Sequence, residues 1–170
     1  MKIPIFVSVG TRLSDEQIEV RNLIYKLLDD FNLEPRTIGR SDYAMTNPLR
    51  EVVVLARHCA GALVLGFGET FLHEGTRTSR DGQIEALHGS PQEIWTTPWG
   101  QIEAGLTSAL GLPLLIFRDK GVSGGVFDIG SSGLFIQEIP TLADWDLKKE
   151  AIREVLQNWR SEVHRHYYGA

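Results

Sequence analysis

A tryptophan and a glutamate four residues apart are the pair whose types and spacing best suit catalysis in this sequence. Trp99 and Glu103 lie in the run TPWGQIE, where Thr97-Pro98 is typical of a helix start. On a helix the two side chains lie on the same side, one turn apart. A carboxylate beside apolar side chains loses hydration, which raises its pKa and favours its use as a base or nucleophile. We therefore predict that Glu103 is catalytic and that Trp99 lines its site.

The neighbours of Glu103 on this predicted helix are apolar or small. Gly100 and Gly105 flank it with little bulk and are expected to leave room for a ligand. The helix periodicity places Glu103 beside an apolar stripe made of Ile102, Leu106, Ala109 and Leu110. The opposing interpretation is a solvated glutamate on a surface helix that pairs with nothing.

The loop Ser8–Arg12 follows an apolar run and precedes a helix-period segment. Backbone N–H groups and the helix dipole at such a place attract an anion, and Arg12 adds a positive charge. Ser8, Gly10 and Arg12 are thus predicted to bind substrate, with phosphate as the group that suits them. An ordinary strand-to-helix turn capped by Ser14 explains the same residues equally well, since the loop is no full glycine-rich nucleotide motif.

Two later loops supply further substrate-binding candidates. Arg40, Asp42 and Tyr43 offer a cation, a hydrogen-bonding carboxylate and a stacking ring, although they also suit an ordinary polar loop. Phe67 ends an apolar run on the same predicted edge. His58 beside Cys59 is expected to be structural, because adjacent helical residues point in different directions. No Cys/His grouping has the spacing of a zinc site, so no metal is predicted.

The elements that must position these residues alternate between short apolar runs and helix-period segments, which is typical of βαβ units. A capping box at Ser14–Gln17 opens the first helix, and others are expected from Pro48 to about Cys59, from Pro98 to Gly111 and over Asp144–Tyr168. Pro35 places the second strand at an edge. We predict an α/β fold, a flavodoxin-like doubly wound sheet of order 2-1-3-4-5, whose strands are Ile3–Val9, Leu33–Ile38, Gly61–Phe67, Leu112–Phe117 and Leu134–Glu138.

One segment does not fit this alternation. Residues 68–96 are long, polar and without clear period, so they are expected to form an irregular loop, either a lid or disordered. No repeat or linker divides the chain, and we expect a single domain over residues 1–170. In such sheets, ligands bind beyond the carboxyl ends of the strands, where the loops described above would converge.

Composition excludes some classes of function. The net charge of −5 argues against nucleic-acid binding, which normally needs a basic surface. The single cysteine, Cys59, forms no internal disulfide and favours a reducing compartment. No run approaches 18 apolar residues, so we expect a cytoplasmic protein without a membrane partner.

The motif around Glu103 resembles those of two known families. Trp99-x-x-x-Glu103 resembles the W-x-x-x-E pattern of bacterial TIR domains. The run from Ile102 to Ile116 is similar to the E-x-G-x-A-x-x-x-G-K-P-V segment of nucleoside 2-deoxyribosyltransferases. Both families have a flavodoxin-like sheet with a catalytic Glu on the helix before the fourth strand. The likeness covers about Ile5 to Ile136, and its specific part is the segment around Glu103.

This resemblance implies cleavage of an N-glycosidic bond. In TIR enzymes the Glu stabilises the oxocarbenium-like ribose left when nicotinamide departs from NAD, whereas in the deoxyribosyltransferases it attacks C1′ of the sugar. The deoxyribosyltransferases carry an Asp where this sequence has Thr97 and a Lys where it has Leu112. Those departures favour the TIR-like alternative, in which Arg12 and Arg40 would meet a pyrophosphate.

We therefore expect a TIR-like enzyme that takes NAD as its substrate and needs no other cofactor. A cyclic ADP-ribose-type signal in bacterial antiviral defence is one product that the resemblance implies. The expected partners are the nucleotide itself and either further copies in a homo-oligomer or an effector protein that responds to the product. A nucleoside 2-deoxyribosyltransferase and a non-catalytic nucleotide-binding or TIR interaction module remain the alternatives.

Overall fold

The computed structural model describes residues 2–38, 48–130 and 135–169, without the side chains of residues 89–92 and 135. Its main sheet has five parallel strands in the order β2-β1-β3-β6-β7, which is the predicted order 2-1-3-4-5 with a hairpin inserted after the third strand. The strands are β1 (Ile3–Val9), β2 (Leu33–Arg36), β3 (Ala62–Gly66), β6 (Leu114–Arg118) and β7 (Phe135–Glu138). The predicted α/β, flavodoxin-like fold is thus confirmed.

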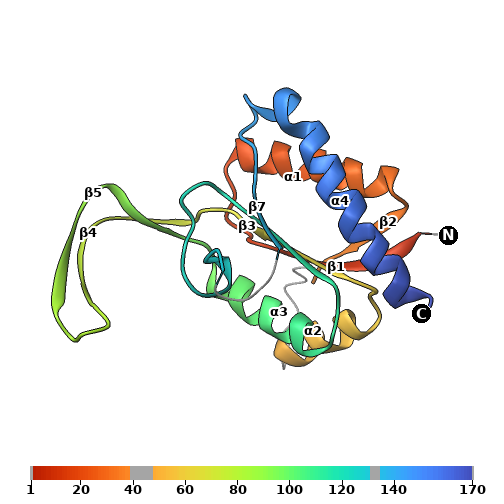
Figure 1. The fold of residues 1–170 in the computed structure, drawn as a ribbon, viewed down its shortest axis with the longest axis horizontal. Coiled ribbons are helices and arrows are strands. Elements are labelled where there is room, and N and C mark those ends of the chain that lie inside the picture. The colour runs from red at the N-terminus through yellow and green to blue at the C-terminus, as the bar shows by residue number, and fades with distance from the viewer. Residues whose placement is uncertain (1, 39–47, 131–134, 170) are drawn as a thin grey trace.

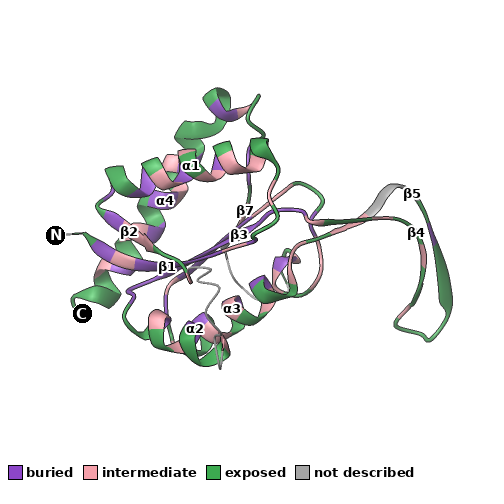
Figure 2. Ribbon diagram, turned by 180° about the vertical axis from the view of Figure 1, so that it is seen from behind, coloured by how far each residue is buried: buried purple, intermediate pink, exposed green. Residues whose placement is uncertain are grey.

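Helices cover both faces of this sheet (Figures 1 and 2). On one face lie α1 (Asp15–Asp30) and α4 (Trp145–Tyr167), and on the other lie α2 (Pro48–Arg57) and α3 (Pro98–Ala109). Each face has its own cluster of buried apolar side chains. All five residues of β3 are buried, as expected for the central strand of a sheet covered on both sides. Among the described residues, no helix is both long enough and apolar enough to cross a bilayer.

The capping box at the start of α1 is present as predicted. The amide of Gln17 donates to the Ser14 hydroxyl (3.2 Å), and the amide of Ser14 donates to the Gln17 side chain (3.0 Å). These bonds satisfy two of the N–H groups that a helix start leaves without partners. The box therefore ends the β1–α1 loop at Ser14 and fixes where the helix begins.

The edge strand β2 is shorter than its sequence suggests, and its shortness opens the sheet beside β1. Its pairing with β1 ends at Phe6 opposite Arg36, although Thr37 and Ile38 had been expected to continue the strand. Pro35 cannot donate to a strand ladder, which agrees with its position on an edge strand. Beyond Phe6, one side of β1 therefore has no neighbouring strand among the described residues.

The expectation of an irregular loop over residues 68–96 is wrong. The segment forms an antiparallel hairpin of β4 (Thr70–Thr78) and β5 (Ile84–Trp95), which projects away from the rest of the protein as a long arm (Figures 1 and 2). Both of its faces meet solvent along most of its length, so the alternation that marks a half-buried strand is weak. The amide of Glu69 donates to the carbonyl of Trp95 (2.9 Å) and closes the arm at its root.

Between β6 and β7 the chain carries a glycine-rich loop with one 3₁₀ turn, Gly125–Phe127, where many such folds have a helix. Phe127 is fully buried and packs so closely on Gly66 that a methyl group there would overlap its ring. Arg118 donates to the carbonyls of Val122 (2.8 Å) and Phe127 (2.6 Å), which holds the loop over the end of β6.

Replacing Phe127 by alanine should test whether this loop belongs to the core. We expect Phe127→Ala to lower the free energy of unfolding by about 3–5 kcal/mol, because it removes a fully buried ring. Ile129→Ala, two residues away and 75% exposed, should change it by no more than about 0.5 kcal/mol. Urea unfolding of both variants measures the difference, and equal losses would contradict the packing described.

Candidate functional site

Glu103 lies in the second turn of α3, on the side that faces β1. The helix begins as predicted, with the Thr97 hydroxyl accepting from the Trp99 amide (3.3 Å) and with Pro98 in the first turn. The Ser8 side chain, on β1, donates a hydrogen bond to Oε2 of Glu103. Ser8 is only 3% exposed, so its end of the hydrogen bond is buried. Glu103, at the other end, borders a cavity.

The predicted apolar stripe of α3 is wrong in its residues. The buried positions are Gly100, Ala104 and Thr107, whereas Ile102 is 42% exposed, Ala109 is exposed, and Leu106 and Leu110 are half-buried. The helix packs on the sheet through small residues, and small residues carry little hydrophobic signal. The consequence is a close approach of the helix backbone to β1 and β3.

Gly100 and Gly105 of α3 were expected to leave room for a ligand beside Glu103, but neither glycine faces the cavity. A methyl group at Gly100 would make ordinary contacts with the Phe127 ring (3.5 Å) and Val64 (4.0 Å), so this position faces the core and not the cavity. Gly105 faces open space. Room beside Glu103 comes instead from the early end of β2.

Burial and hydrogen bonding act in opposite directions on Glu103. Burial raises the pKa of its carboxyl above the ordinary value, and the hydrogen bond from Ser8 lowers it again in part. The raised pKa agrees with the expectation for a carboxylate beside apolar groups. The hydroxyl of Ser8 favours the ionised form, because a carboxylate accepts a hydrogen bond more strongly than a neutral acid does.

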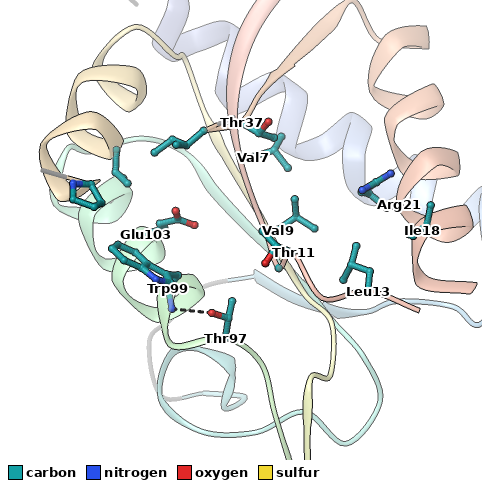
Figure 3. Close-up of a pocket in the computed structure, with 14 residues that line it drawn as sticks. Val7, Val9, Thr11, Leu13, Ile18, Arg21, Thr37, Thr97, Trp99 and Glu103 are labelled. Carbon is teal, nitrogen blue, oxygen red and sulfur yellow. Dashed lines mark hydrogen bonds between the residues drawn. The ribbon is translucent and has the colours of Figure 1, made fainter. Parts of the chain in front are cut away.

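Glu103 opens into a cavity of about 600 Å³ at the carboxyl ends of β1 and β2. This volume falls within the usual range for small-molecule sites, about 300–1,000 Å³. Figure 3 shows Glu103 and Trp99 on one wall, Val7 and Val9 of the open edge of β1 between the walls, and Arg21 of α1 on the opposite side. The other lining residues are Gly10, Thr11, Leu13, Ile18, Thr37, Ile38, Pro48, Val52 and Thr97.

Several predicted site residues come together here and others do not. Glu103, Trp99 and Gly10 line the cavity, and Ser8 holds Glu103. Arg12 is exposed and is not among the lining residues. Phe67 is buried and borders a separate, smaller cavity at the root of the hairpin. The predicted binding residues Arg40, Asp42 and Tyr43 lie outside the described residues.

The start of α1 offers less to an anion than its loop suggests. Its capping box occupies the amides of Ser14 and Gln17, and Asp15 and Glu16 place two carboxylates in the first turn. Acidic side chains there already interact favourably with the helix dipole and repel a further negative charge. Among the described residues that line the cavity, Arg21 is the only basic one.

Arg21 was missed by the sequence analysis. Its guanidinium donates to Asn22 (3.0 Å from Nη2) and lies 5.9 Å from the centre of the Tyr25 ring. A half-buried Arg on an amphipathic helix gives no local signal that it borders a cavity, because the cavity forms between α1 and distant elements.

Gln101 and Asp119 were also missed, and both fix loops around the site. Gln101 of α3 donates to the carbonyl of Gly124 (2.8 Å) and accepts from the amide of Val126 (2.9 Å). Asp119 accepts from the amide of Gly68 (2.9 Å) and from the Gln17 side chain (3.0 Å). These contacts join the glycine-rich loop to α3 and the root of the hairpin to α1.

The structural interpretation of His58 and Cys59 agrees with their contacts. Nδ1 of His58 lies 2.7 Å from the carbonyl of Val54, and the buried thiol of Cys59 donates to the carbonyl of Leu55 (3.3 Å). Burial raises the pKa of Cys59 to about 11, which opposes formation of a thiolate. Across the described parts of the chain, no group of three or more potential ligands is placed to hold a metal ion.

Comparison with known proteins adds no identification. No protein-family model matches the chain, and no curated protein matches it at a significant level.

The raised pKa of Glu103 should appear as a pH-dependent stability difference. Between the ordinary value of 4.5 and the raised value, the folded protein binds the Glu103 proton more tightly than the unfolded chain. Stability contributed by that proton is complete below this window and is lost as pH rises through it. Glu103→Gln keeps an oxygen acceptor for Ser8 but cannot ionise. We therefore expect its unfolding free energy, relative to the wild type, to rise as the pH is raised above 4.5 and to level off once Glu103 is ionised in the folded protein.

Urea unfolding across this pH range measures that difference. Glu154→Gln, an exposed position on α4, serves as the matched control and should show no such trend. A Glu103→Gln curve that runs parallel to the wild type at every pH would show that the carboxyl is not desolvated.

Proposed function

We propose that this protein cleaves the N-glycosidic bond between nicotinamide and ribose in NAD, with Glu103 as the catalytic residue. The observation that carries the proposal is the half-buried Glu103 carboxylate, held by Ser8 at the wall of a cavity of about 600 Å³. The resemblance of Trp99-x-x-x-Glu103 to the bacterial TIR pattern supports the same reaction.

The chemistry asks for a fixed negative charge near C1′ of the ribose. When the bond to the pyridinium nitrogen breaks, nicotinamide leaves as a neutral molecule and positive charge develops on the sugar. A carboxylate fixed beforehand stabilises that charge, most strongly where water is excluded. Val7, Val9 and Val52 supply apolar walls, and the hydrogen bond from Ser8 favours the ionised Glu103 that this role needs.

Other groups of the cavity suit the rest of such a substrate. The Trp99 ring, 43% exposed on the same wall, offers a stacking surface for a planar base. Arg21 stands across the cavity and is the described side chain best placed to meet a phosphate group. A cytoplasmic location, a cyclic nucleotide product, a role in antiviral defence and assembly into a homo-oligomer or with an effector belong to the same proposal.

Release of nicotinamide from NAD tests the proposal directly. We expect release by the purified protein, assayed over a range of protein concentrations because assembly is part of the proposal. Glu103→Gln should lower kcat by at least about a hundredfold, because it removes the charge that stabilises the transition state. Glu150→Gln, exposed on the opposite face of the sheet, should retain full activity. Equal release by Glu103→Gln and wild type would remove Glu103 from the mechanism.

A second candidate, transfer of 2-deoxyribose between bases, is favoured by the scarcity of basic residues. A nucleoside needs no partner for a pyrophosphate, and the described lining of the cavity contains Arg21 alone as a cation. In this reaction Glu103 would attack C1′ and hold the sugar covalently until a second base displaces it.

Incubation with a deoxynucleoside and a different free base separates the two candidates. Appearance of the new deoxynucleoside, lost in Glu103→Gln, would establish the transferase and replace the proposal of NAD cleavage. Absence of transfer with every pair of bases would eliminate the transferase. A rise in melting temperature with NAD but no turnover would instead identify a nucleotide-binding module.

A further inference from the structure

A second carboxylate, Glu69, lies at the same end of the sheet as Glu103, although no motif or spacing in the sequence indicates it. Glu69 lies three residues after the end of β3 and immediately precedes the hairpin strand β4. Its backbone is fixed by the bond from its amide to the carbonyl of Trp95. Its side chain folds back over Gly10, so closely that a methyl group on Gly10 would overlap Oε1 and lie 3.1 Å from Cδ.

We propose that Glu69 is a second catalytic residue, the base that accepts a proton from the water that attacks C1′ after nicotinamide has left. This inference rests on the proposed function and names the acceptor half of the same reaction. It depends on three observations, which concern the face of the sheet, the partners of Glu69 and the balance of the chemistry.

The first observation is that Glu69 and Glu103 approach the same face of the sheet. Side chains two residues apart on a strand point to the same face, about 6.6 Å apart. Ser8 points to the face where α3 lies, because it bonds Glu103. Gly10 is the residue that follows the end of β1, two positions after Ser8, and the Glu69 carboxyl fills the position of its missing side chain. The Glu103 carboxyl is therefore held at Ser8 and the Glu69 carboxyl at Gly10, two positions apart along the chain. Gly10 and Glu103 line the cavity, and Glu69 packs on Gly10 without being a lining residue itself.

This spacing leaves space for a water molecule. In O-glycosidases that use water as the direct acceptor, the two catalytic carboxyls are about 6.5–9.5 Å apart, so that the sugar and the water fit between them. The strand repeat that separates the Ser8 and Gly10 positions gives a spacing of the same order. A side chain at position 10 would displace the Glu69 carboxyl, so the glycine there allows Glu69 to lie against the end of β1.

The second observation is that Oε1 of Glu69 is buried yet has no hydrogen-bond partner among the described residues. Other carboxylates near the root of the hairpin are satisfied, since Glu93 accepts from Arg77 and Trp95, and Asp119 accepts from Gly68 and Gln17. A buried polar oxygen without a donor costs free energy, and a bound water or substrate hydroxyl removes that cost. A carboxylate oxygen that lacks a donor in this way is suited to accept a hydrogen bond from the attacking water.

The third observation is chemical balance. The bond between C1′ and the pyridinium nitrogen breaks, its electron pair leaves with neutral nicotinamide, and the departing group needs no proton. A bond forms from the water oxygen to C1′, and the proton that water must lose goes to Glu69 and then to solvent. Glu103 stabilises the positive charge of the sugar. The role that remains for a second carboxylate is to accept the proton of the attacking water.

The test compares two acceptors in the same enzyme. Water must lose a proton when it attacks C1′, whereas a neutral pyridine such as 3-acetylpyridine has none to lose and forms the exchanged dinucleotide directly. With NAD and 3-acetylpyridine, Glu69→Gln should raise the ratio of exchange product to hydrolysis product at least about tenfold over wild type. Glu103→Gln should lose both products. Gly10→Ala, whose methyl displaces the Glu69 carboxyl, should shift the ratio in the same direction.

Matched controls separate this role from a structural one. Glu74→Gln, exposed on the hairpin, should leave the ratio unchanged. If Glu69 only supports the fold, Glu69→Gln lowers both products in proportion and the ratio stays constant, which would overturn the inference while the proposed function stands. A wild-type protein that releases no nicotinamide would overturn both together.

Discussion

The hydrogen bond between Ser8 and Glu103 sets the distance at which α3 must lie from β1, and much of the structure follows from that distance. A carboxylate reaches a strand hydroxyl inside the protein only where the helix backbone comes close to the sheet. Gly100, Ala104 and Thr107 permit this approach, because none of them has a large side chain. The small residues on the buried face of α3 therefore allow the hydrogen bond between Ser8 and Glu103 to form, and larger residues there would prevent it.

The same contact places a polar group where burial opposes it. Desolvation of Glu103 destabilises its ionised form, and one hydrogen bond offsets only part of that effect. Apolar residues on both sides of the sheet supply the stability that allows such a group to persist. Functional sites commonly lower the stability of the folded protein. A group that must react with a substrate cannot have all of its hydrogen bonds made by the protein itself.

The features of the fold that could be predicted from the sequence are those that depend on residues close together in the chain. Apolar runs identified the five parallel strands, and the capping box marked the start of α1. The hairpin was missed because its strands are solvated on both faces, and the stripe of α3 because small residues carry little hydropathy. Arg21 and Glu69 lie near Glu103 only because the fold brings distant segments together, and no spacing along the chain encodes that. Glu103 was found because its neighbour Trp99 and its helix lie in one short segment.

The root of the hairpin lies between two parts of the site. β4 begins at the residue after Glu69, and β5 ends two residues before Thr97, the cap of the helix that carries Glu103. Nine residues of β4 reach up to about 30 Å from that root at 3.3 Å per residue. The hairpin is thus a long arm whose root lies beside Glu69 and the helix that carries Glu103. A rotation of the arm by about 10° about its root moves the tip by about 5 Å. A contact that holds the tip in place would therefore limit the rotation of the root to a few degrees.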